Sequence, residues 1–141
     1  MNRLLPAAVV AFTFFSVGCA GLPEAVSVEP TDVPFVEQEG FKNGLVVDKV
    51  TVSRARNRVE FAIEVTSDQE RGLTLFNPSR GDVISLQRMI PEGDSIVRVY
   101  TSAGALRRVD AVTVNFSIPG TELTGRIFLD YSVIAGVLAD Q

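Results

Sequence analysis

Apolar and polar residues alternate along much of the chain after residue 57, and this period of two restricts the fold more than any other feature. In the clearest stretch, residues 58–66, every second residue is apolar: Val59, Phe61, Ile63 and Val65. Side chains of a strand point alternately to its two faces, so the pattern predicts a strand with one buried and one exposed face. Residues 112–118 and 127–133 repeat the pattern and predict two more strands.

Shorter runs rich in β-branched residues predict the other strands. They cover residues 45–54, 73–76, 83–90 and 96–101, and residues 133–138 are expected to form a last strand with a small cap. In the run 83–90 we expect Ile84, Leu86 and Ile90 to share one face. Residues 91–94 and 102–104 read as turns, and Ala55-Arg56-Asn57 reads as a short hairpin connection with Asn57 available for positive φ. No stretch after the N-terminal segment shows a convincing helical period.

Roughly seven short strands separated by polar turns predict an all-β domain, an antiparallel β-sandwich of Ig-like or related type. A small closed β-barrel is the alternative. Four large side chains on the apolar faces are the expected core: Phe61, Phe116, Leu129 and Tyr131.

The first 18 residues have the composition of a secretory signal peptide. Arg3 is the only charge before Glu24, and an apolar run leads to small residues around Cys19. A basic start, an apolar stretch of this length and a small-residue end are typical of such peptides. The run is also slightly short for a span of about 20 residues.

Ser16-Val17-Gly18-Cys19 resembles the processing box of bacterial lipoproteins, in which Gly or Ala precedes the Cys; Ser16 departs from the usual Leu. The resemblance covers about the first 19 residues. It implies that Cys19 carries lipid and becomes the mature N-terminus, and because no Asp follows the Cys, it implies an outer-membrane anchor facing the periplasm. Secretion after cleavage at Ala20 and an uncleaved membrane anchor are the alternatives.

Residues 19–41 are predicted to be an acidic tether, with the folded domain at residues 42–141. After Cys19 the segment holds five acidic residues, three prolines and no Lys or Arg. Prolines fix φ and like charges repel, which favours an extended spacer. Alternatively the segment pairs with a basic or strand-edge partner through Phe35 and Val36.

Composition excludes several classes of function. The chain has no His and one Cys, which removes His-based catalysis, Cys/His zinc sites and an intrachain disulfide. Its formal net charge of −4 argues against nucleic-acid binding. Glu60 and Glu64 share one strand face, but beside Arg58 they read as a solvated face rather than a glycosidase pair. We expect no cofactor, no metal site and no enzymatic activity.

Arginines around the 54–58 hairpin and at 107–108 form a candidate basic patch for anionic lipid headgroups, a glycan or a protein partner. Its members are Arg54, Arg56, Arg58, Arg107 and Arg108. The alternative is that these charges keep the hairpin tip soluble and protect strand edges.

The sequence as a whole favours a non-enzymatic envelope lipoprotein that binds or scaffolds another envelope protein, held to the membrane by its N-terminal lipid. Alternatives are a phage-type outer-membrane spanin subunit, a small glycan- or peptidoglycan-active lipoprotein, and a ligand-carrying lipoprotein.

Overall fold

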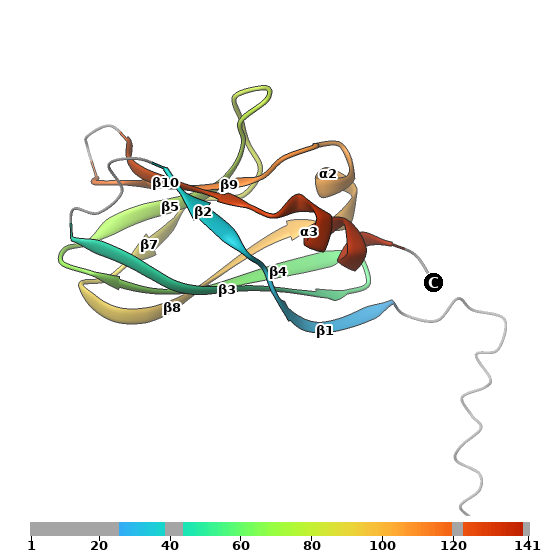
Figure 1. Cartoon of the computed structure of the whole chain (residues 1–141), viewed down its shortest axis with the longest axis horizontal. Helices are drawn as coiled ribbons and strands as arrows, with labels where there is room; N and C mark the ends of the chain where they lie inside the picture. The colour runs from blue at the N-terminus through green and yellow to red at the C-terminus, as the bar shows by residue number, and fades with distance from the viewer. Residues whose placement is uncertain (1–25, 39–43, 120–122, 140–141) are drawn as a thin grey trace, which may run out of the picture.

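A computed structural model describes residues 26–38, 44–119 and 123–139. These residues form two antiparallel sheets that face each other, as predicted for a β-sandwich (Figure 1). One sheet has four strands in the order β1-β3-β4-β8, and the other has β2-β10-β9-β5-β6 with β7 paired to β5.

The strands of the four-stranded sheet are β1 (Ser27–Asp32), β3 (Leu45–Ala55), β4 (Arg58–Ser67) and β8 (Gly93–Ser102). Those of the six-stranded sheet are β2 (Phe35–Glu37), β5 (Arg71–Asn77), β6 (Asp82–Val83), β7 (Arg88–Ile90), β9 (Thr113–Ser117) and β10 (Leu123–Leu129). Two helices, α2 (Ala103–Arg107) and α3 (Tyr131–Leu138), lie at one end of the sandwich (Figure 1).

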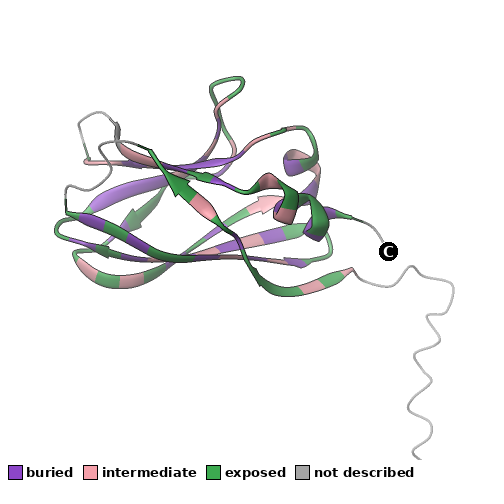
Figure 2. Cartoon of the chain, in the orientation of Figure 1, coloured by how far each residue is buried: buried purple, intermediate pink, exposed green. Residues whose placement is uncertain are grey.

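Alternation of apolar residues translates directly into burial between the sheets (Figure 2). On β4, Val59, Phe61, Ile63 and Val65 are at most 1% exposed. Opposite them lie apolar side chains of the other sheet: Leu73, Leu75, Val114, Phe116 and Ile127. The core prediction is confirmed for Phe61, Phe116 and Leu129, whereas Tyr131 is only half-buried and packs against the core.

The segment expected to be an acidic tether belongs in part to the sandwich. Its strand β1 pairs with β3, and β2 pairs with β10, so the chain crosses from one sheet to the other. Val33, between the two strands, is 3% exposed and its N–H donates to the Val50 carbonyl at 2.8 Å. The prediction of a solvated spacer is therefore wrong for residues 26–38. This segment pairs with strand edges of its own domain.

The C-terminal strand prediction is wrong beyond Leu129. Residues 131–138 form helix α3, whose N-cap Asp130 accepts a hydrogen bond from the Ser132 N–H. Asp at this position satisfies an unpaired helix donor and stops the preceding strand. Ile134, Val137 and Leu138 bury one side of the helix against the open end of the sandwich.

Three further details differ from the sequence expectations. Residues 83–90 are not one strand, since β6 and β7 are separate and Leu86 is 87% exposed. The turn expected at residues 102–104 begins α2, capped by the Ser102 hydroxyl. At the β3–β4 hairpin, Arg56 rather than Asn57 has positive φ, 59°.

Candidate functional site

Arginines of the candidate basic patch lie at the end of the sandwich that carries the helices, but they divide into two groups. Arg54 and Arg107 both donate hydrogen bonds to carbonyls at the end of α3. Arg54 is 7% exposed and donates from Nη1 to the carbonyls of Val137 and Leu138, at 3.2 and 3.0 Å. Arg107 Nη2 donates to the same Leu138 carbonyl at 2.8 Å.

These contacts have a simple electrostatic cause. The last carbonyls of a helix lack intrahelical donors and carry a partial negative charge, which cations stabilise. α3 has no basic residue of its own in its last turn, and the two arginines come from β3 and α2 instead. The prediction of an exposed patch is therefore wrong for Arg54, which is a buried helix-capping residue.

Arg56, Arg58 and Arg108 are exposed, as the patch prediction requires, and Arg107 is exposed as well despite its bond to Leu138. Arg56 lies at the hairpin tip, where its N–H donates to the Val26 carbonyl at 2.6 Å. The described chain thus begins beside the arginine-bearing end. Arg58 turns instead onto the outer face of the four-stranded sheet, 4.1 Å from the centre of the Tyr100 ring. The structure brings Arg56 and Arg58 to one hairpin.

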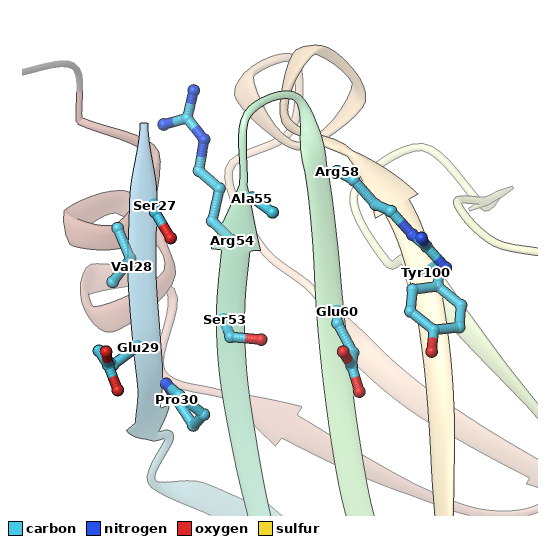
Figure 3. Close-up of a pocket in the computed structure, with 10 residues that line it drawn as sticks. All are labelled: Ser27, Val28, Glu29, Pro30, Ser53, Arg54, Ala55, Arg58, Glu60 and Tyr100. Carbon is cyan, nitrogen blue, oxygen red and sulfur yellow. The ribbon is translucent and has the colours of Figure 1, made fainter. Parts of the chain in front are cut away.

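A shallow groove of about 340 Å³ follows the outer face of this sheet (Figure 3). Ser27 to Pro30 of β1 border it on one side, and the stacked Arg58 and Tyr100 border it on the other. Ser53 and Glu60 lie between, and Glu60 accepts a hydrogen bond from Arg98 Nη1 at 2.7 Å. The hydrogen bond to this carboxylate, followed by its charge, raises the pKa of Arg98.

The groove combines a cation stacked on an aromatic ring, a paired carboxylate and a hydroxyl. Such a surface can hold a polar ligand or a polypeptide by hydrogen bonds and stacking. Glu64 lies on the same strand as Glu60, β4, four residues further along, and the register pairs it with Ile96. Within the described ranges, no group of three or more Cys, Asp or Glu side chains could hold a metal ion.

Sequence reasoning missed Tyr100 and Arg98 as site residues. The alternation of residues 96–101 does put Ile96, Arg98 and Tyr100 on one face. What the sequence lacks is the strand order, which sets this face beside Arg58 and Glu60. The predicted lipidation residue, Cys19, lies outside the described residues.

Comparisons with known proteins assign no relative. No protein-family model matches the chain, and no curated protein or solved structure matches it. Neither helix in the described part of the chain is long and apolar enough to cross a membrane.

Proposed function

We propose that the chain is a lipid-anchored envelope protein whose β-sandwich is a non-enzymatic binding or scaffolding module. Cys19 would carry the lipid in the outer membrane, and the sandwich would face the periplasm. The observation that carries this proposal is the position of Val26, which is bonded to the hairpin tip at the arginine-bearing end.

That position limits the distance between lipid and domain. About seven residues separate Cys19 from Val26, and a fully extended chain of this length spans at most about 25 Å. The sandwich would therefore stay close to the bilayer, with its edges and outer faces available to other envelope proteins. A folded sandwich of this kind supports a binding role through sheet edges or faces.

Exposed apolar side chains on both sheets support the same role. Val36 and Phe128 are paired neighbours on the outer face of the six-stranded sheet and are 68% and 40% exposed. Ile96 and Tyr100 are 54% and 36% exposed on the other sheet. Val36 and Phe128 are adjacent, and contiguous exposed apolar surface is a mark of interaction sites.

The anchor is tested by Cys19→Ala in the full chain. We expect loss of incorporated palmitate label, and either release of the domain into the soluble periplasm or a block in processing. Ser16→Leu, which supplies the residue usual at that position, is the matched control and should keep the label. A Cys19→Ala variant that matures normally and stays in the membrane would overturn the proposal.

A further inference from the structure

Strand β8 forms one edge of the four-stranded sheet along its whole length. Its hydrogen-bonded strand neighbour is β4, and the register runs without a shift from Arg58↔Ser102 to Ser67↔Gly93. In the described part of the chain no other strand pairs with it. A long, regular free edge presents a row of backbone N–H and C=O groups that can pair with another strand.

The other edge strands lack this property. β1 contains Pro30, and its pairing with β3 shifts between Val28 and Thr31. β2 and β7 have three residues each and β6 has two. Proline, register shifts, short length and charged side chains are usual protections of an edge strand. β8 has none of the first three, and its two charged residues, Asp94 and Arg98, have opposite signs. It is therefore the edge suited to strand addition.

The outer face of β8 carries its own complementary charges. Asp94, Ile96, Arg98 and Tyr100 alternate along it, and all four are exposed. Arg98 is oriented by Glu60 and Asp94 accepts a hydrogen bond from the Thr66 hydroxyl at 2.8 Å, so both charges are held on this face.

We propose that β8 pairs antiparallel with β8 of a second copy of this chain, with Ile96 on the two-fold axis. In this register Asp94 lies opposite Arg98 of the second copy, and the symmetry makes the contact twice. Centring the pair on Arg98 or on Asp94 would set like charges opposite each other, which destabilises a sheet. The Ile96-centred register is the one that opposes two β8 residues of unlike charge.

The pairing joins two four-stranded sheets into one of eight strands and removes the free edge. Its two-fold axis is normal to the sheet, as in an isologous dimer. The two Val26 residues then lie at opposite ends of the assembly. If both copies are lipid-anchored, the short span from Cys19 requires the strands to lie along the membrane plane. The pairing itself does not depend on the lipid.

A disulfide scan of the full chain in envelopes tests the register. Residues opposite each other in an antiparallel pair have Cα atoms about 4.5–5.5 Å apart, which suits a disulfide. Ile96→Cys should therefore give a covalent dimer under mild oxidation. Tyr100→Cys, on the same strand and face, is the matched control: its two copies would lie about 27 Å apart and should stay monomeric. The unsubstituted chain reports any dimer formed through Cys19.

Exchanging the charges of Asp94 and Arg98 tests whether the strand that pairs with β8 is β8 of a second copy. Asp94→Arg in the Ile96→Cys background should abolish the dimer band, because each introduced arginine would face Arg98 of the other copy. Adding Arg98→Asp should restore it, and thermal melting shows that each variant is folded. The proposal is overturned if Ile96→Cys stays monomeric, if Tyr100→Cys crosslinks equally, or if the double exchange in a folded chain fails to restore the dimer.

Discussion

The Nη1 atom of Arg54 donates to the carbonyl oxygen of Leu138 at 3.0 Å, and this contact ties the end of α3 to the four-stranded sheet. Arg54 lies on β3, more than eighty residues earlier in the chain. Because Nη1 also reaches Val137, one buried cation satisfies two terminal carbonyls.

We expect Arg54→Ala to lower the free energy of unfolding by about 2–4 kcal/mol. The substitution removes charge-assisted hydrogen bonds and takes the Arg54 donor from the Val137 carbonyl, while the Leu138 carbonyl keeps the bond from Arg107. Chemical denaturation followed by circular dichroism measures the loss. Arg108→Ala, at an exposed position near the same end, is the control and should change stability by less than about 0.5 kcal/mol. Equal effects of the two substitutions would contradict the capping role.

Arg56 adopts a backbone conformation that suits glycine, with φ of 59°. A side chain there costs roughly 1–2 kcal/mol, which glycine avoids at some cost in unfolded-state entropy. Arg56→Gly should therefore raise the free energy of unfolding by about 0.5–1 kcal/mol. Asn57→Gly, one residue on and without positive φ, should be neutral or destabilising in the same denaturation experiment. A destabilised Arg56→Gly variant would show that its side chain matters more than its backbone.

Ionisation of Tyr131 makes the free energy of unfolding depend on pH in the alkaline range. Its hydroxyl donates to the Leu106 carbonyl at 2.6 Å, and burial first, then the charge of Asp110, raises its pKa above 10.0. The folded state therefore favours the neutral phenol. This contribution is fully present below the unfolded pKa and is lost as pH rises through the folded pKa.

Tyr131→Phe should cost about 1 kcal/mol at neutral pH through the lost hydrogen bond. It should also flatten the fall in stability above a pH of about 10. Denaturation at a series of pH values measures both effects, and ultraviolet titration of Tyr100→Phe, which leaves Tyr131 as the single tyrosine, locates its pKa. A folded pKa at or below that of the denatured chain would refute the prediction.

Two substitutions in α3 test whether residues 131–138 form a helix or the strand that the sequence suggested. Ile134 is fully buried, so Ile134→Ala should cost about 2–4 kcal/mol. Gly136 is exposed within the helix and a Cβ there would meet nothing within 4 Å. Gly136→Ala should therefore stabilise the protein by about 0.5–1 kcal/mol, since alanine favours a helix. Thermal and denaturant unfolding give both values; a destabilising Gly136→Ala would count against the helix.

The sequence predicted the strand content well because alternation is a local property. Residues 58–66 and 112–118 alternate without interruption, and both contain strands whose apolar side chains are buried. The strand prediction failed at residues 131–138, which the sequence marks by the end of the alternation at residues 127–133 and by an apolar run at 133–138. A helix with one buried face and a strand with one buried face have similar apolar content. In the structure Asp130 caps the segment, and the open end of the sandwich buries one of its sides, so a helix forms there.

Site residues were less accessible to sequence reasoning. Arginines at positions 54 and 107 look like any other surface arginines until α3 folds back against them. Similarly, residues 27–37 have the composition of a tether, and only the free edges of β3 and β10 turn them into strands.

Neighbouring residues alone specify that this chain forms short strands with one apolar face, because side-chain alternation is a property of adjacent positions. The identity of each strand's neighbours, the edge that stays free and the charges that become buried are settled only when the sheets pack together. They depend on contacts between residues far apart in the chain, such as Arg54 with Leu138 and Tyr100 with Arg58, and no local pattern records them.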